Sequence, residues 1–247
     1  MSNAPCLLSV ILVMKNSAAF VGAALESVIR QSRPPDEIIV VDGLSSDESV
    51  AIAHSFRPDF PGLQVVTQSE PGLAAARNYG LALASGQLIA HMDHDDIWMP
   101  AKLERQVRHL EETPDCWAVV GHMVRFLEPG SKLSVQYNET DLGHPVAAFT
   151  PASLLARRLL YERIGQFNPA LLIACDLDLF VRIRDAGLRM DLLPDVVIHK
   201  RLHEQNVSNR LSQYRTDTLA YLRASLNRRK AAADSGQAGV QDANRTE

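Results

Sequence analysis

The sequence predicts an α/β protein built on a mostly parallel sheet with helices on both of its faces. Through about the first hundred residues, short apolar runs rich in β-branched residues alternate with segments whose apolar residues recur at helical spacing. This is the pattern of successive strand–helix–strand units. The runs are apolar throughout rather than at every second position, as expected for parallel strands that are covered on both sides.

The expected elements of the first half follow this alternation. Strands are expected at residues 7–14, 37–41, 63–67 and 87–92. Helices are expected at residues 18–31, 46–56 and 73–84, the first ending before Pro34 and Pro35. The last of the four strands runs directly into an acidic turn at residues 93–96.

The second half has a weaker pattern. Helices are expected at residues 100–112 and 176–186, and strands at 117–124 and 196–201. Residues 128–146 are rich in Gly, Pro, Ser and Asn and predict a long surface loop, a kind of segment that is uncommon unless it binds something. A final helix with a basic end is expected at residues 211–230, followed by a disordered tail at 233–247.

Composition excludes several classes of protein. The 247 residues are 46% hydrophobic and 22% charged, and the net charge of −4 gives no general attraction to nucleic acid or anionic lipid. The longest apolar run, residues 6–14, is half as long as a membrane-spanning helix, and the N-terminus lacks a secretory signal pattern. Cys6, Cys116 and Cys175 have no CxxC spacing, which predicts a reducing, cytoplasmic setting and no structural zinc site.

Polar groups follow the expected strands at the edge where open α/β sheets bind ligands. Asn16 follows the first strand, Asp42 ends the second, and Asp93, Asp95 and Asp96 follow the fourth. Three carboxylates in one turn repel one another unless a cation offsets them, and their oxygens suit Mg²⁺ or Mn²⁺ shared with substrate phosphates. The alternative is that these acids only cap the helix that follows. Spacing leaves both interpretations open.

Four segments resemble, in the same order, the opening of family 2 glycosyltransferases. They are SVILVMKN at 9–16, EIIVVD at 37–42, GLAAARNYG at 72–80 and IAHMDHDDIW at 89–98. The resemblance covers roughly residues 8–208 and implies the GT-A fold, a single domain spanning residues 1–232 here. It implies a nucleotide-sugar-binding half at about 7–98 and an acceptor-binding half at about 99–210.

The resemblance also implies an activity. The chain would be an inverting glycosyltransferase that moves a sugar from a nucleotide-diphosphate sugar, most readily a UDP-sugar, to an acceptor hydroxyl with the help of Mn²⁺ or Mg²⁺. The acceptor would be a saccharide, a glycolipid or another molecule in polysaccharide or glycoconjugate biosynthesis. Two alternatives are a nucleotide-sugar-binding scaffold whose site has decayed, and a sugar nucleotidyltransferase.

Carried over residue by residue, the resemblance implies roles on the donor side. Asn16 would line the nucleotide pocket, Asp42 would bind the base and Arg77 would lie near the diphosphate. Asp93 would contact the ribose and the donor sugar, and Asp95, the second acid of a DxD motif, would reach the metal. The alternatives from the residues alone are that Asp42 caps its own loop and that Arg77 is a surface arginine.

On the acceptor side, the segment ACDLDLFVR at 174–182 resembles the family's Glu-Asp-x-Asp-Leu stretch, with Cys175 in place of the glutamate. Asp176 would be the general base that takes the proton of the acceptor hydroxyl; its alternative role is a helix N-terminal acid. The segment KRLHEQNVS at 200–208 resembles a downstream motif whose histidine, here His203, would complete the metal shell. Two further departures are Lys15 in place of an aromatic residue and Leu44 in place of glycine.

The final expected helix carries an unusual combination of residues. Leu219, Leu222 and Leu226 are interspersed with Arg223 and with three basic residues at 228–230. Such a helix either packs one face on the domain or lies at a membrane surface that carries a lipid-linked acceptor. The second interpretation adds a peripheral membrane contact to a cytoplasmic protein.

Overall fold

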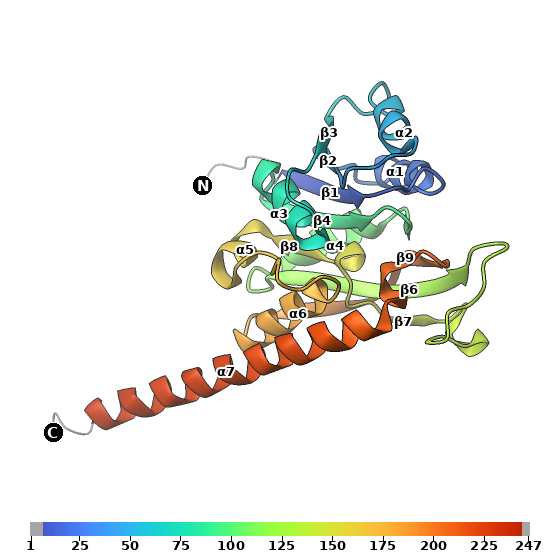
Figure 1. The fold of residues 1–247 in the computed structure, drawn as a ribbon. Coiled ribbons are helices and arrows are strands. Elements are labelled where there is room, and N and C mark those ends of the chain that lie inside the picture. Colours follow the sequence, from blue (N-terminus) through green and yellow to red (C-terminus); the bar gives the residue numbers. More distant parts are fainter. Residues whose placement is uncertain (1–6, 244–247) are drawn as a thin grey trace.

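The computed structural model describes the backbone of residues 7–243 and the side chains of residues 7–231. Its nine strands form one sheet in the order β3-β2-β1-β4-β8-β6-β9-β5, with β7 paired to β6 (Figure 1). The first half is parallel, as predicted, through the pairs β1–β2, β1–β4 and β2–β3. These strands are β1 (Leu8–Met14), β2 (Glu37–Asp42), β3 (Leu63–Thr67) and β4 (Leu88–Asp93).

The helices of the first half cover opposite faces of this sheet. Helices α1 (Val21–Ile29) and α2 (Ser49–Ser55) pack on one face, together with α4 (Lys102–Glu112). Helix α3 (Leu73–Leu83) packs on the other face, and it lies close to β1 because Gly80 has no side chain. A Cβ atom at Gly80 would lie 2.4 Å from Cγ2 of Ile11.

The second half mixes parallel and antiparallel pairs. Strand β8 (Leu155–Arg157) joins the two halves, because it is antiparallel to both β4 and β6 (Ala118–Leu127). Strand β9 (Met190–Leu202) is parallel to β6 and begins six residues earlier than the sequence pattern predicts. Its first part, before Val197, consists of half-buried and exposed side chains and therefore lacks the continuous apolar run of a central strand. The two short strands of this half are β5 (Ile97–Trp98), which pairs with β9, and β7 (Pro145–Ala147), which pairs with β6.

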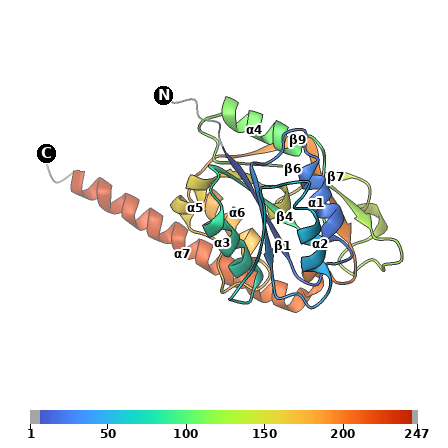
Figure 2. The same cartoon turned by 90° about the horizontal axis from the view of Figure 1, so that it is seen from above.

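The remaining helices lie on the same side of the sheet as α3. They are α5 (Arg158–Ile164), α6 (Cys175–Asp185) and α7 (Leu211–Ala243), and short 3₁₀ turns lie at Glu139–Asp141, Pro151–Ser153 and Val207–Asn209. Helix α7 runs beside α6, and its C-terminal part extends away from the domain (Figures 1 and 2). None of the helices in the described part of the chain is both long and apolar enough to cross a membrane.

Two sequence expectations concern the ends of this half. Residues 128–146 form a long connection with a single 3₁₀ turn and the start of β7, as the loop prediction requires. Helix α7 continues to Ala243, beyond the end expected at residue 230. This segment contains several alanines and no proline, so the helix meets no strong stop signal there. Residues 244–247 of the expected tail lie outside the described residues.

Candidate active site

A pocket of about 300 Å³ lies between the two halves of the sheet, where β1 and β4 end. Val13 of β1 pairs with Asp93 of β4, so the turn after β4 opens at the carboxyl edge of the parallel strands, as the strand order predicts. Five charged side chains among those that line the pocket are Arg77, Asp93, Asp95, Asp176 and Lys200. Segments more than a hundred residues apart therefore supply one polar cavity.

Asp95 is the most strongly held acid of this pocket. Its Oδ2 atom lies 3.0 Å from Nε2 of His203 and accepts a hydrogen bond of 2.9 Å from Nδ2 of Asn206. Both partners follow β9, and all three residues are buried. Burial would raise the pKa of Asp95, but the Lys200 ammonium and the hydrogen bond to His203 hold it below its usual range. Asp95 is therefore a buried carboxylate ion at neutral pH.

The Asp95–His203 pair fits a divalent ion. Two ligands that bind one octahedral ion at neighbouring positions, each at about 2.1 Å, are separated by about 3 Å. The Asp95 and His203 ligand atoms are 3.0 Å apart, which matches this separation; binding one ion to both would replace the hydrogen bond that joins them. Carboxylate oxygen and imidazole nitrogen suit Mn²⁺, and an octahedral ion with two protein ligands keeps other positions for substrate oxygens.

Arg77 connects the two halves of the pocket. It comes from α3, and its side chain is only 3% exposed. Its Nη2 atom donates to Oδ1 of Asp93 at 2.9 Å, and its Nη1 atom donates to Sγ of Cys175 at 3.5 Å. The guanidinium also lies over the Phe167 ring. The interpretation of Arg77 as a surface arginine is therefore wrong, because its helix turns this face towards the sheet.

The Nε atom of Arg77 is buried and has no hydrogen-bond partner among the described residues. Burial would lower the pKa of Arg77, but Asp93, Cys175 and Asp176 raise it. A permanent cation therefore lines the pocket, which is an arrangement suited to an oxygen-rich ligand.

Asp176 lies in the first turn of α6 and lines the pocket. Its Oδ1 accepts a hydrogen bond of 2.8 Å from the amide of Leu177. Burial raises the pKa of Asp176, and Asp93 raises it further, while the nearby Arg77 guanidinium opposes both. The side chain therefore has the properties of a proton acceptor: it reaches a pocket and holds its proton more tightly than an exposed aspartate.

Cys175, which precedes this aspartate, is a buried free thiol. Burial raises the pKa of Cys175 to about 11, although Arg77 lowers it. The side chain is therefore a protonated thiol at neutral pH, and a reactive thiolate is not available there. Its Sγ atom accepts the hydrogen bond from Nη1 of Arg77 and carries no charge to pair with that cation.

Asp96, the third acid of the turn, has a structural role. Its carboxylate accepts hydrogen bonds from Nζ of Lys200 at 3.1 and 3.2 Å and from the amide of Arg201 at 3.2 Å. Burial would lower the pKa of Lys200, but Asp96, Asp95 and Asp93 raise it above its usual range. The fully buried Asp96 therefore anchors the acidic turn to β9.

Asn16 and Asp42 lie together in the loops after β1 and β2, outside the set of residues that line the pocket. The Asn16 side chain accepts a hydrogen bond of 2.8 Å from the amide of Ser46, and the Asp42 carboxylate accepts from the amide of Ser45 at 3.1 and 3.2 Å. Leu44, which lies between Asp42 and Ser45 in this loop, has a φ of 64°. Loop capping by Asp42 is thus observed, and the nucleotide-binding roles of both residues stay predictions.

The sequence does not point to three further residues of the site, which are Asp217, Tyr137 and Arg125. Asp217 of α7 accepts hydrogen bonds from the amides of Ile173 and Ala174 at 2.7 and 3.1 Å, which fixes the start of the helix that carries Asp176. Tyr137 of the long loop lines the pocket and lies 5.4 Å from the Arg125 guanidinium. These residues belong to segments without a recognisable motif, so only the folded arrangement identifies them.

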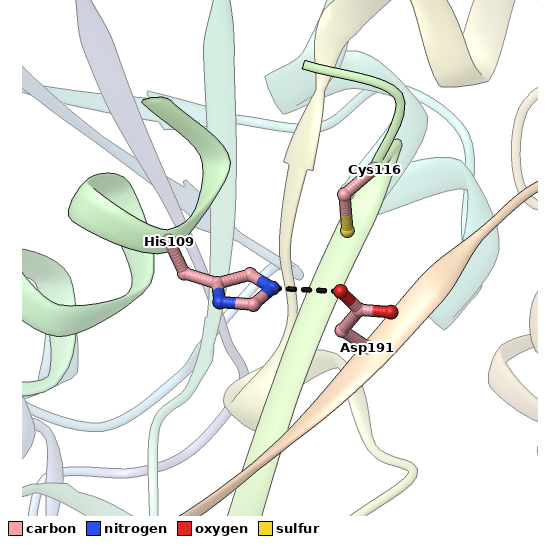
Figure 3. A group of neighbouring side chains, drawn as sticks. All are labelled: His109, Cys116 and Asp191. Atoms are coloured by element: carbon pink, nitrogen blue, oxygen red, sulfur yellow. Dashed lines mark hydrogen bonds and ion pairs between the residues drawn. The ribbon is translucent and has the colours of Figure 1, made fainter. Parts of the chain in front are cut away.

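A second cluster of potential metal ligands, drawn in Figure 3, contains none of the residues that line this pocket. Nε2 of His109 lies 2.7 Å from Asp191, and the ligand atoms of these two residues and Cys116 are within 4.8 Å of one another. Arg189 donates to both oxygens of the same Asp191 carboxylate, and burial raises the pKa of Cys116. A guanidinium beside the carboxylate and a protonated thiol do not suit a cation, so we interpret this cluster as structural.

A family model and the curated relatives of this chain indicate the same kind of protein. The model of the glycosyl transferase family 2 matches residues 9–162. An uncharacterised glycosyltransferase of Rickettsia felis is 27% identical over 224 residues, which is 84% of this chain and 36% of that protein. The chain spans about a third to two thirds of the length of the first curated relatives that it matches.

Two solved structures share the fold. The mannosyltransferase PcManGT of Pyrobaculum calidifontis, in complex with GDP-Man and Mn²⁺, is 22% identical with a TM-score of 0.68, over 89% of this chain and 64% of that one. TarS of S. aureus, residues 1–349 in complex with UDP-GlcNAc, is 20% identical with a TM-score of 0.64, over 81% of this chain and 60% of that one. These likenesses confirm the expected GT-A fold.

Proposed function

This chain belongs to glycosyl transferase family 2, and from this premise we propose that it is an inverting glycosyltransferase. It transfers a sugar from a nucleotide-diphosphate sugar to an acceptor hydroxyl. One observation carries the proposal: Asp95 backed by His203, Arg77 paired with Asp93, and Asp176 all meet at one pocket. A group that can hold a metal, a cation for phosphate and a base are the components that such a transfer needs.

The donor is a nucleotide-diphosphate sugar, with a UDP-sugar as the first candidate. Arg77 provides positive charge for the diphosphate, and its position in the pocket lining supports this role. We assign Asp93 to the ribose and the donor sugar, and Asn16 and Asp42 to the nucleotide. The complexes of two proteins of similar fold with UDP-GlcNAc and with GDP-Man support this ligand class without selecting the base or the sugar.

Asp95 and His203 would hold the divalent ion, Mn²⁺ or Mg²⁺. When bound, the ion neutralises the charge that develops on the departing diphosphate. The short distance between the two side chains supports this assignment, and so does the presence of Mn²⁺ in the complex of PcManGT. Asn206 keeps the Asp95 carboxylate in place through its own hydrogen bond.

Asp176 is the general base of the proposed reaction. Its carboxylate accepts the proton of the acceptor hydroxyl while the hydroxyl oxygen forms a bond to the anomeric carbon of the sugar. The bond between that carbon and the phosphate oxygen breaks, and its electron pair leaves with the nucleoside diphosphate on the opposite face. Attack from the face opposite the leaving group inverts the configuration at that carbon.

The outward face of α7 supports a peripheral contact with an anionic membrane. Leu219, Leu222 and Leu226 are 69%, 42% and 56% exposed, and Arg215, Arg223, Arg229 and Lys230 stand exposed between and beside them. These four cations have no ionic partner among the residues whose side chains are described. Exposed leucines interspersed with unpaired cations match the composition of helices that lie in an anionic bilayer surface.

A thermal-shift screen tests the proposed donor chemistry. UDP, GDP, CDP and dTDP are added with and without Mn²⁺, because a ligand that binds only the folded state raises the melting temperature. We expect one nucleotide to give a Mn²⁺-dependent rise that Asp95→Ala abolishes.

Donor turnover without acceptor then distinguishes the alternatives. Slow release of nucleoside diphosphate supports the transferase, formation of pyrophosphate supports a nucleotidyltransferase, and formation of neither product supports a nucleotide-sugar-binding scaffold.

A further inference from the structure

A second cavity lies beside the candidate active site. It is a groove of about 590 Å³ between α6 and α7. Its walls include Phe180 and Val181 of α6, Leu188 and Met190 after that helix, and Tyr221 of α7. Arg184 is the single charged residue in its lining. This lining leaves apolar side chains in contact with water, and burying them against an apolar ligand is favourable.

The groove adjoins the catalytic pocket. Phe149 and Leu177 line both cavities, and the Phe149 ring contacts the Phe180 ring edge to face, with centroids 5.9 Å apart. Leu177 directly follows Asp176. An apolar group attached near a hydroxyl at Asp176 therefore meets apolar side chains at the boundary with the groove.

The direction of the groove follows from the helix that forms its wall. Leu177, Val181 and Arg184 share one face of α6 because they are four and three residues apart. Seven residues of helix at 1.5 Å each extend the wall by about 10 Å from the base towards Arg184. Arg184 is 67% exposed, and its nearest acidic atom, on Asp185, is 3.7 Å away. That carboxylate is already bound by Ser225 and Arg228, so Arg184 is available to an anionic group.

We propose that this groove binds an apolar chain of the acceptor, so that the acceptor is an amphiphile that carries its reacting hydroxyl next to a lipid tail. The proposal rests on the proposed function, because it takes Asp176 as the base that marks the acceptor side. Two features of the structure favour a lipid over a purely polar saccharide. The groove is apolar along its length, and the helix that forms its other wall presents leucines and unpaired cations outwards.

The groove is tested with a fluorescent amphiphile, 11-(dansylamino)undecanoic acid, which brightens on leaving water. We expect saturable binding to the full chain, with displacement by decyl β-glucoside below its micellar concentration and none by methyl β-glucoside. Val181→Gln places an amide in the groove wall and should weaken binding about tenfold. Leu188→Gln, at a lining position outside α6, provides a second variant if the first alters folding.

Leu159→Gln is the matched control, because Leu159 is exposed on α5 and lines neither cavity. It should bind the probe as the unchanged protein does. Non-saturable binding, or equal affinity in the folded groove variants and the control, overturns the proposal. Probe binding needs no nucleotide, so this experiment and the thermal-shift screen can give opposite results. A Mn²⁺-dependent nucleotide shift without probe binding rejects the proposal of a lipid acceptor but leaves the proposed transferase activity in place.

Discussion

Nε2 of His203 lies 3.0 Å from Oδ2 of Asp95, although 108 residues separate the two in sequence. The contact is possible because β5 and β9 pair at Ile97 and His199, which brings the turn after β4 beside the end of β9. Two motifs with no sequence relationship thereby form one site. The pairing of these strands, rather than either motif alone, creates the candidate metal position.

This pair predicts which variants lose metal-dependent binding. Asp95→Asn keeps the size of the side chain but removes the charge that a divalent ion requires, so Mn²⁺-dependent affinity for the nucleoside diphosphate should fall at least about tenfold. His203→Gln should cause a smaller loss in the same direction. Binding is measured by titration of the nucleotide with and without Mn²⁺. The control is His199→Gln, because His199 lies on β9 but outside the pocket, and this variant should bind the nucleotide as the unchanged protein does. Unchanged Mn²⁺-dependent affinity in Asp95→Asn would contradict the metal assignment.

Asp176→Asn predicts a loss of turnover without a loss of donor binding. An amide cannot accept the hydroxyl proton, and a positioned general base contributes about 10²- to 10⁴-fold to rate. The rate of nucleoside diphosphate release in the presence of acceptor should fall by that factor, while the Mn²⁺-dependent thermal shift stays. Near-normal turnover would contradict the role of Asp176.

Asp178→Asn is the matched control on the same helix. Its carboxylate accepts a hydrogen bond of 2.8 Å from Nε of Arg182 and is nearly buried, so we interpret it as structural. Its replacement should cost about 2 kcal/mol of unfolding free energy and leave the turnover of the folded protein nearly unchanged. The two aspartates thus separate catalysis from stability.

The pH dependence follows from the environment of Asp176. Burial raises the pKa of Asp176, and the base works only when it is deprotonated, so kcat/KM should rise with pH along an acid limb. The midpoint of that limb should lie above 3.8, the ordinary value for aspartate. Arg77 opposes the upward shift, so Arg77→Met should move the limb to higher pH. A limb that does not move in this variant would show that another group controls it.

The parallel first half and the acidic turn are predictable from sequence because each strand is a continuous apolar run that ends in a polar residue. Short motifs in the sequence predict Asp93, Asp95 and Asp176, because each motif is recognisable without knowledge of what its residues contact in the fold. The role of Asp96 was not predictable, because its partner Lys200 lies 104 residues away. The role of Asp217 is not predictable for a similar reason. Its carboxylate binds the backbone at the start of α6, but it lies on α7, whose sequence shows only amphipathic spacing.

Leu44 predicts a gain in stability from a single substitution. Its φ of 64° is in the left-handed region, which costs a residue with a Cβ atom about 1–2 kcal/mol. Leu44→Gly should therefore raise the unfolding free energy by about 1 kcal/mol after the added freedom of glycine in the unfolded chain, or the melting temperature by about 2–4 °C. Leu44→Ala keeps the Cβ atom and should give no such gain. Equal melting temperatures for the two variants would refute the strain at this position.

The outward face of α7 predicts binding to anionic membranes. Each basic residue near such a surface contributes about 1 kcal/mol, so Arg223→Glu together with Lys230→Glu should reduce sedimentation with phosphatidylglycerol vesicles by tenfold or more. Phosphatidylcholine vesicles should bind the unchanged protein weakly, because they lack the negative surface charge. Lys132→Glu together with Arg163→Glu makes the same change in net charge at exposed positions outside α7 and should preserve vesicle binding. If both double variants lose binding equally, the attraction comes from net charge alone, and the leucine and arginine face of α7 has no special role.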